Sequence, residues 1–214
     1  MATRTGTITA FPNKHGATDS SYSYDTDFFD GDGSSYFYTY STSKKPCILY
    51  GFNFNELQEL NNNYPVKITG LKLSISAKQY NSSSTYVSVR FVSNFKTSGL
   101  TTSEYTDLGD NSITMIDGTI TSSYTVYEKA DFPNTLNWIN SNLDDFFNGY
   151  STNSFGIRLY GNRFYINKIY LTVTYEYEGG GVNEILFDNV KPKKFFIDTN
   201  EVKAILVDTT KVYG

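Results

Sequence analysis

Alternating hydrophobic and polar positions dominate most of the chain. In the run Val66–Ala77 (VKITGLKLSISA), apolar side chains occupy every second position apart from one shift at Gly70. The runs Thr85–Ser93 (TYVSVRFVS) and Ile169–Tyr177 (IYLTVTYEY) alternate in the same way. A period of two, together with an excess of β-branched and aromatic residues, predicts β-strands with one buried face.

Shorter runs of the same kind occur at 3–10, 35–40, 47–54, 113–127 and 154–160. Clusters of Ser, Asn, Asp and Gly separate them, as turns do between antiparallel strands. About eight such strands, each with one buried face, predict a two-sheet antiparallel sandwich.

One segment departs from this alternation. Between residues 134 and 149 the apolar positions recur at helical spacing: Leu136, Ile139, Leu143 and Phe146 or Phe147. Pro133 is typical of a helix start, and Gly149 of a helix end. We predict one short helix over Asn134–Gly149 that caps an open end of the sandwich.

Three consecutive glycines, Gly179–Gly181, follow the last strong strand. Because glycine loses more conformational freedom on ordering than any other residue, the triplet predicts a linker and a domain boundary. Residues 185–194 (ILFDNVKPKK), 195–204 (FFIDTNEVKA) and 205–214 (ILVDTTKVYG) then form an internal repeat. Each unit opens with three apolar residues, and Asp with Asn or Thr follows, a pair that suits a tight turn.

Each repeat unit is predicted to be a strand, a turn and a second strand. Ten residues cannot bury a core alone, so the units must stack on each other or on a partner. We predict that residues 182–214 form a three-unit β-repeat that anchors or oligomerises the chain. Its expected assembly residues are Ile185, Phe187, Asp188, Phe195, Ile197, Asp198, Ile205, Val207 and Asp208.

Charge and composition narrow the function. The formal net charge of −4 argues against nucleic-acid binding, which needs a concentrated basic surface. No apolar run approaches the roughly 18 residues of a membrane helix, and the start MATRTGTITAF lacks the pattern of a secretory signal. The single cysteine excludes an intrachain disulfide, and the single histidine excludes a multi-histidine metal centre.

Little in the sequence indicates catalysis. His15 could pair with Asp19 as a catalytic base, but a histidine in a surface loop is the favoured interpretation. Cys47 lies in a β-type run and is expected to be a small buried residue rather than a reactive thiol. No particular pair of carboxylates is marked as facing across a cleft, as a glycosidase requires. We therefore expect no enzymatic activity.

An acidic stretch, DTDFFDGDG at 25–33, is the sharpest local cluster. Its four carboxylates are Asp25, Asp27, Asp30 and Asp32. Together they could wrap Ca²⁺, but the spacing is not that of an EF-hand and no bidentate Glu follows. An acidic, solvated turn is the favoured interpretation, and no cofactor is expected.

Aromatic residues make up 17% of the chain, and several lie in predicted loops beside polar residues. A ring stacks on the apolar face of a sugar while neighbouring polar groups bind its hydroxyls. The candidates for such carbohydrate binding are Tyr22, Tyr24, Tyr80, Tyr105, Trp138 and Tyr150. The alternative, favoured because no fixed ring spacing stands out, is that the tyrosines serve strand and interface packing.

The chain also resembles a group of viral proteins. Its repeat of three apolar residues, Asp-Thr and Lys-Val-Tyr is similar to short C-terminal modules of tailed-bacteriophage virion proteins, especially those of Gram-positive hosts. The segments Ile68–Ala77, Asn153–Leu159 and Ile166–Tyr177 resemble, in the same order, strands of the jelly-roll, galactose-binding-like domains in phage head-fibre, decoration and tail proteins.

This resemblance implies an all-β fold: an antiparallel jelly-roll β-sandwich with one short helix over residues 1–178, a glycine linker at 179–181 and the β-repeat at 182–214. It further implies a non-enzymatic virion component, made in the host cytoplasm and exposed on the head or tail. Other virion proteins, further copies of the chain and host-surface glycan are the expected partners, with no nucleic acid and no membrane. Two alternatives stay open: a purely architectural component without a ligand, and a carbohydrate-binding ancillary domain of a glycan-processing system.

Overall fold

The computed structural model describes residues 2–17, 23–24, 36–80, 84–96, 104–179, 196–197, 200–201, 205–207 and 210–213. The chain divides into two compact units. The larger is Arg4–Tyr177, and the smaller combines Met1–Thr3 with Glu178–Gly214.

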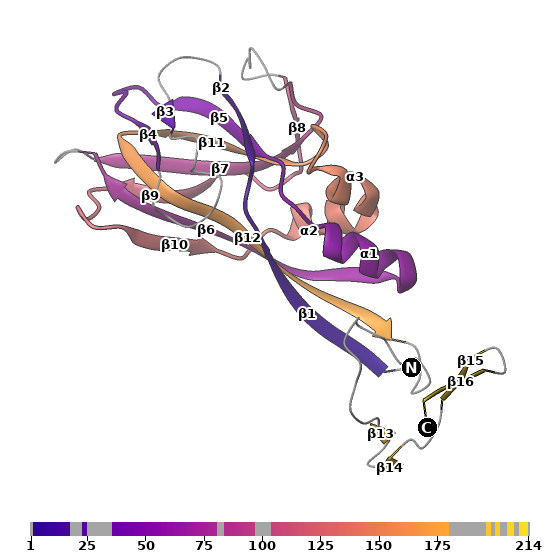
Figure 1. Ribbon diagram of the computed structural model, residues 1–214. Coiled ribbons are helices and arrows are strands. Elements are labelled where there is room, and N and C mark those ends of the chain that lie inside the picture. The colour runs from indigo at the N-terminus through magenta and orange to yellow at the C-terminus, as the bar shows by residue number, and fades with distance from the viewer. Residues whose placement is uncertain are drawn as a thin grey trace. The chain divides into compact units, whose positions relative to one another are not determined.

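Two six-stranded sheets build the larger unit (Figure 1). Sheet A has the strand order β10-β6-β12-β4-β3, and β1 also pairs with β12. Its strands are β1 (Ala2–Ala10), β3 (Ser23–Tyr24), β4 (Phe37–Thr39), β6 (Val66–Gln79), β10 (Thr125–Lys129) and β12 (Phe164–Gly179). Sheet B has the order β2-β5-β11-β7-β8, and β9 also pairs with β7. Its strands are β2 (Lys14–Ala17), β5 (Lys45–Tyr50), β7 (Thr85–Ser93), β8 (Thr106–Asp107), β9 (Ile113–Gly118) and β11 (Gly156–Asn162).

Most consecutive strands lie in different sheets, for example β4 and β5, β5 and β6, β6 and β7, β9 and β10, β10 and β11, and β11 and β12. The orders that result, β4-β12-β6-β10 and β5-β11-β7-β9, describe the two sheets of a jelly roll. The predicted all-β, antiparallel jelly-roll sandwich is confirmed.

Alternate residues of the strands form the core between the sheets. Along β6, the residues Ile68, Leu71, Leu73, Ile75 and Ala77 are all buried. The shift at Gly70 is a β-bulge: Thr174 pairs with Gly70 and Tyr175 with Ile68, so Thr69 is the extra residue of β6. The break in the sequence pattern therefore marks a real irregularity of the strand.

Three helices gather at one end of the sandwich: α1 (Asn55–Asn63), α2 (Pro133–Ser141) and α3 (Leu143–Asn148) (Figure 1). The prediction of a single helix over 134–149 is wrong, because Asn142 divides the segment. The backbone N–H of Asn142 donates to Ile139 O at 3.1 Å, and its side-chain Nδ2 donates to Trp138 O at 2.8 Å. Its own carbonyl accepts from Phe146 N at 3.0 Å, which begins α3.

The helix α1 is absent from the prediction made on sequence alone. The run CILYGFNF at 47–54 was expected to be extended throughout, but β5 ends at Tyr50, where Gly51 takes a φ of +78°. Phe52 and Phe54 then enter the core, and Leu57 is the buried residue of α1. One buried position in nine residues is too weak a pattern to predict a helix.

Asn140 of α2 takes the place of a neighbouring strand for β6. The Ile68 N–H donates to Asn140 Oδ1 at 2.8 Å, and Asn140 Nδ2 donates to Ile68 O at 2.8 Å. The pairing of β10 with β6 extends only to Leu73, so this amide serves a stretch of β6 that lies beyond the end of β10. The Asn140 side chain thereby joins α2 to sheet A.

Replacing this amide is expected to destabilise the sandwich. Asn140→Ala leaves the N–H and C=O of Ile68 without their partner, which costs about 2 kcal/mol of unfolding free energy. The exposed Asn137 of α2 offers a matched control, since Asn137→Ala makes the same change of helix propensity. Guanidinium unfolding followed by circular dichroism measures both variants, and equal stabilities would disprove this role of Asn140.

In the smaller unit, the repeat forms short hairpins. β13 (Phe196–Ile197) pairs with β14 (Asn200–Glu201), and β15 (Ile205–Val207) pairs with β16 (Thr210–Tyr213). The second and third repeat units thus each contain two paired strands, and the predicted turns between them, at 198–199 and 208–209, lie outside the described residues. The first unit, 185–194, lies outside the described residues. β12 continues through Gly179, the first residue of the predicted linker.

Candidate functional site

Six tyrosines gather on sheet A where β4 pairs with β12. Phe37 of β4 faces the core with no exposed surface, so its neighbours Tyr36 and Tyr38 lie on the opposite face of the sheet. Tyr40 continues the same alternation. The exposed fraction is 40% for Tyr36 and 53% for Tyr40, so rings of this row are open to solvent.

The register of the sheet continues the row across neighbouring strands. Tyr38 is opposite Tyr165 of β12, and Tyr165 is opposite Lys78 of β6. The ring centroids of Tyr38 and Tyr165 are 5.3 Å apart. Lys78 Nζ lies 5.4 Å from the ring centroid of Tyr165 and 4.6 Å from that of Tyr124, just before β10. Side chains from four segments therefore form one continuous surface.

Further contacts between rings connect the remaining tyrosines to this surface. The ring of Tyr165 lies 5.2 Å from that of Tyr36 and 5.5 Å from that of Tyr80, and Tyr40 lies 5.8 Å from Tyr80. We call this set the tyrosine face, made of Tyr36, Tyr38, Tyr40, Tyr80, Tyr124, Tyr165 and Lys78. It combines aromatic rings, phenolic hydroxyls and one cation.

Two of the phenols on this surface, Tyr165 and Tyr124, are held in their neutral form by their surroundings. Burial, assisted by the nearby phenols of Tyr80, Tyr36 and Tyr38, raises the pKa of Tyr165. Burial likewise raises the pKa of Tyr124, together with its neighbours Tyr36 and Tyr165. Protonated phenols both donate and accept hydrogen bonds, so the face offers polar groups beside its rings.

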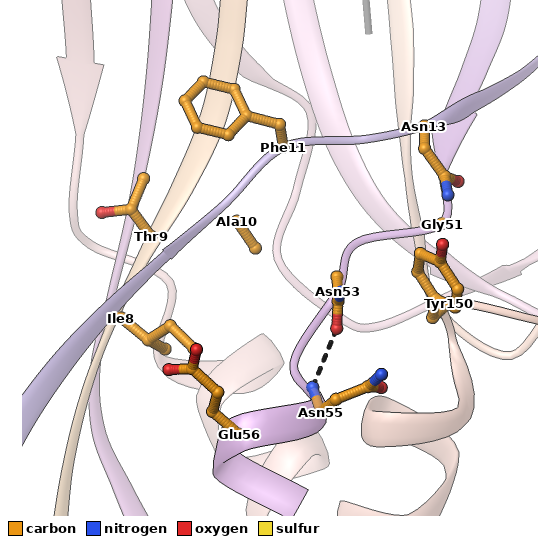
Figure 2. Close-up of a pocket in the computed structure, with 10 residues that line it drawn as sticks. All are labelled: Ile8, Thr9, Ala10, Phe11, Asn13, Gly51, Asn53, Asn55, Glu56 and Tyr150. Atoms are coloured by element: carbon orange, nitrogen blue, oxygen red, sulfur yellow. Dashed lines mark hydrogen bonds between the residues drawn. The ribbon is translucent and has the colours of Figure 1, made fainter. Parts of the chain in front are cut away.

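A pocket of about 580 Å³ lies at the helix end of the sandwich (Figure 2). The end of β1, the β5–α1 connection, the start of α1 and the segment after α3 all contribute to its walls. The lining residues are Ile8, Thr9, Ala10, Phe11, Asn13, Gly51, Asn53, Asn55, Glu56 and Tyr150. In the view of Figure 2, Asn53 and Asn55 lie between Glu56 and Tyr150.

Local interactions hold the polar groups of this pocket in place. Asn53 Oδ1 accepts from the backbone N–H of Asn55 at 3.0 Å, which shapes the entry to α1. Lys14 Nζ donates to Tyr150 O at 3.3 Å and lies 5.8 Å from the Tyr150 ring centroid. Asn13 Oδ1 is buried against Gly51 and has no hydrogen-bond partner among the described residues. A Cβ at position 51 would lie 1.8 Å from that oxygen, so this wall requires glycine.

The structure separates the four predicted carbohydrate-binding residues whose side chains it describes. Tyr80 belongs to the tyrosine face and Tyr150 to the pocket. Tyr105 lies on sheet B with its ring 5.3 Å from the guanidinium of Arg158, and Trp138 stacks on Phe155 at 6.3 Å. Tyr24 is in β3, its side chain outside the described part of the chain, and Tyr22 lies outside it altogether.

Most of the tyrosine face was missed in the sequence. The run SYFYTY at 35–40 did carry a signal, because strand alternation places Tyr36, Tyr38 and Tyr40 on one face. Tyr165 and Tyr124 join them only through strand pairing, which no local pattern reveals.

The residues considered for catalysis have other places in the structure than a catalytic site. The prediction of a loop for His15 is wrong: it lies in β2, opposite Leu49 of β5, and burial lowers its pKa. Asp19 lies outside the described residues. Cys47 is fully buried, and burial raises the pKa of its thiol, which confirms the predicted packing role.

Several predicted sites fall on undescribed parts of the chain. The four aspartates Asp25, Asp27, Asp30 and Asp32 lie there. Within the described ranges, no group of three or more His, Cys, Asp or Glu side chains could hold a metal ion. Of the expected assembly residues, Ile197 is in β13, whereas Ile205 and Val207 are in β15. The remainder, Ile185, Phe187, Asp188, Phe195, Asp198 and Asp208, are outside the described residues.

Comparison of the sequence with protein-family models and with curated proteins gives no match. A search of the described residues for a helix long and apolar enough to cross a membrane finds none. The functional argument therefore starts from the tyrosine face and the pocket.

Proposed function

We propose that this protein is a non-enzymatic structural component of a tailed-phage virion that displays its sandwich to bind host-surface carbohydrate. The tyrosine face is the observation that carries the binding function. The anchoring role rests on the C-terminal repeat and on the resemblance of both parts to phage head-fibre, decoration and tail proteins.

The tyrosine face suits an extended sugar chain better than a small molecule that has to be enclosed in a cavity. Its rings follow the outer side of a sheet, so an extended oligosaccharide can lie across several of them. The rings of Tyr36, Tyr38, Tyr40, Tyr80 and Tyr165 each pack on a neighbour at 5.2–5.8 Å, which limits the conformational entropy lost on binding. Tyrosine adds a hydroxyl beside an apolar ring, matching the mixed surface of a sugar.

The C-terminal hairpins would bring many copies of the chain together on one particle. Their apolar strands are too short to bury a core, so pairing with neighbouring chains or virion proteins would complete them. Display of many sandwiches on one particle turns weak individual contacts into firm attachment.

A purely architectural role is the second candidate, and one observation favours it. Exposed tyrosines are enriched at protein interfaces, and Val126 of the edge strand β10 is also 51% exposed. In that case the tyrosine face and β10 would contact a neighbouring virion protein, and no glycan would bind.

Removing the two most exposed rings of the tyrosine face tests the proposal. We expect the double variant Tyr36→Ala/Tyr40→Ala to bind an array of bacterial oligosaccharides at least about tenfold less tightly than the parent chain, because central Tyr contacts often carry over 1 kcal/mol each. Tyr105→Ala, on sheet B, is the matched control and should retain parental binding.

Two results contradict the proposal. Unchanged binding by the double variant would place the glycan elsewhere on the molecule. A parent chain that binds no oligosaccharide of the array but assembles into oligomers would favour the architectural role.

A further inference from the structure

The pocket at the helix end is a second site, separate from the tyrosine face. It lies beside α1, whereas the tyrosine face lies where β6 ends, next to Gln79 and Tyr80. Its volume of about 580 Å³ falls within the range of small-molecule sites, roughly 300–1,000 Å³. Its walls combine two aromatic residues, Phe11 and Tyr150, with amide, hydroxyl and carboxylate groups.

The polar groups of the pocket match hydroxyls. Asn53 commits its Oδ1 to the Asn55 backbone, which leaves its amide nitrogen as a donor. Asn55 offers both a donor and an acceptor, and the Glu56 carboxylate accepts. Asn13 adds an unpaired amide oxygen at the wall. Turning that side chain toward the cavity would replace an unsatisfied buried acceptor with a hydrogen bond to a ligand hydroxyl.

Other ligand classes fit less well. Glu56 is the one charged side chain among the lining residues, and its negative charge opposes an anion. Lys14, the nearby cation, is engaged with the carbonyl and ring of Tyr150. A single carboxylate is a weak basis for a hard divalent cation, which takes six to eight oxygen ligands. A wholly apolar ligand would leave the amides unpaired.

We propose that this pocket binds one neutral sugar residue. Glu56 and the amides of Asn53 and Asn55 bind its hydroxyls, and the ring of Tyr150, 37% exposed, lies against its apolar face. The inference shares its ligand class with the proposed function but uses none of the residues of the tyrosine face. In a glycan-binding chain it would recognise a chain end or a branch.

Titration of the full chain with glucose, galactose, mannose and N-acetylglucosamine tests this inference. We expect at least one sugar to shift the backbone amide NMR signals of Gly51, Asn53, Asn55 and Glu56, with a saturable Kd on the order of 1 mM. Glu56→Gln and Tyr150→Ala should each raise that Kd about tenfold. Both side chains are exposed, so the variants are expected to fold, and the spectrum itself checks this.

Matched controls separate the pocket from its surroundings. Glu59→Gln removes the same charge from an exposed position of α1 outside the pocket and should leave the Kd within twofold. Tyr36→Ala/Tyr40→Ala should leave the pocket signals unchanged. If the pocket titration fails while that double variant still loses array binding, the pocket inference falls and the proposed function stands. The reverse pair of results removes the tyrosine face as a binding surface and retains the pocket.

Three outcomes would overturn the inference: no shift with any of the four sugars, shifts that Glu56→Gln and Tyr150→Ala leave unaltered, or shifts of the same amides with CaCl₂ in place of sugar.

Discussion

Deletion of residues 182–214 is expected to leave a folded sandwich that binds a glycan-coated surface about 10²- to 10⁴-fold less tightly than the full chain. The single-site affinity for a soluble oligosaccharide should stay unchanged, because the tyrosine face and the pocket both belong to the unit Arg4–Tyr177. The deletion removes both described hairpins and none of the strands of sheets A and B.

The expected loss of surface affinity is large because the sandwich would bind the sugar and the repeat would hold several sandwiches together. A site of millimolar Kd contributes only about 4 kcal/mol of binding free energy, too little for lasting attachment by itself. When several copies are held together, each further contact becomes intramolecular at a high effective concentration. The repeat would then determine avidity although it contacts no sugar.

Light scattering on the full chain and on the chain without residues 182–214 measures the oligomeric state, and surface plasmon resonance measures the binding to the glycan-coated surface. An oligomer that falls to a monomer on truncation, with a matching loss of avidity, would support an assembly role for the repeat. A monomer in both cases would contradict self-assembly. A truncated chain that unfolds or aggregates would show that the boundary at the glycine triplet is misplaced.

Phe155→Ala is expected to lower the free energy of unfolding by about 3–5 kcal/mol, the range for deleting a fully buried Phe side chain. Phe155 is 1% exposed and lies directly before β11. Its ring centroid lies 4.9 Å from that of Phe146 in α3 and 5.9 Å from that of Phe91 in β7. Removing the ring opens a cavity where the helices meet the sandwich, and dense packing keeps the surrounding side chains from filling it completely.

Thermal unfolding measures this loss. For a domain of this size each kcal/mol moves Tm by roughly 2–4 °C, so a decrease of about 10 °C is expected. Tyr150→Ala, which removes a partly exposed ring a few residues earlier, should change stability by less than about 1 kcal/mol. Equal effects of the two substitutions would mean that Phe155 does not hold the helix end to the sheets.

The Phe155 variant also has a consequence for the pocket. Tyr150 and Phe155 belong to the same segment between α3 and β11, and a Cβ at Gly149 would lie 2.9 Å from the Phe155 Cβ. Loosening Phe155 is therefore expected to disturb Tyr150 and weaken sugar binding in the pocket. The tyrosine face, at the other end of β6, should be less affected.

Much of the strand content was determined by the sequence itself. The run Thr85–Ser93 coincides with β7, and the shift at Gly70 marks the bulge of β6. Apolar residues that open the second and third repeat units lie in β13 and β15. These features were predictable because side-chain alternation depends on residues close together in the chain.

Other features were decided only by the tertiary structure. Asn142 divides a segment whose apolar spacing suits one helix, and its role depends on hydrogen bonds at both helix ends. His15 enters a strand because β5 is available to pair with it. The helix α1 carries only two apolar residues, Leu57 and Leu60, so packing against the core rather than a long local pattern stabilises it.

The candidate sites also combine features that the sequence determined with features that only the tertiary structure decided. The sequence determined that Tyr36, Tyr38 and Tyr40 share one face of a strand. Only the pairing of β4, β12 and β6 brought them beside Tyr165, Lys78 and Tyr80, which come from distant parts of the chain. The pocket likewise needs β1, α1 and the segment after α3 to meet. Strand register and helix docking minimise the free energy of the whole core, so neither can be read from any one segment.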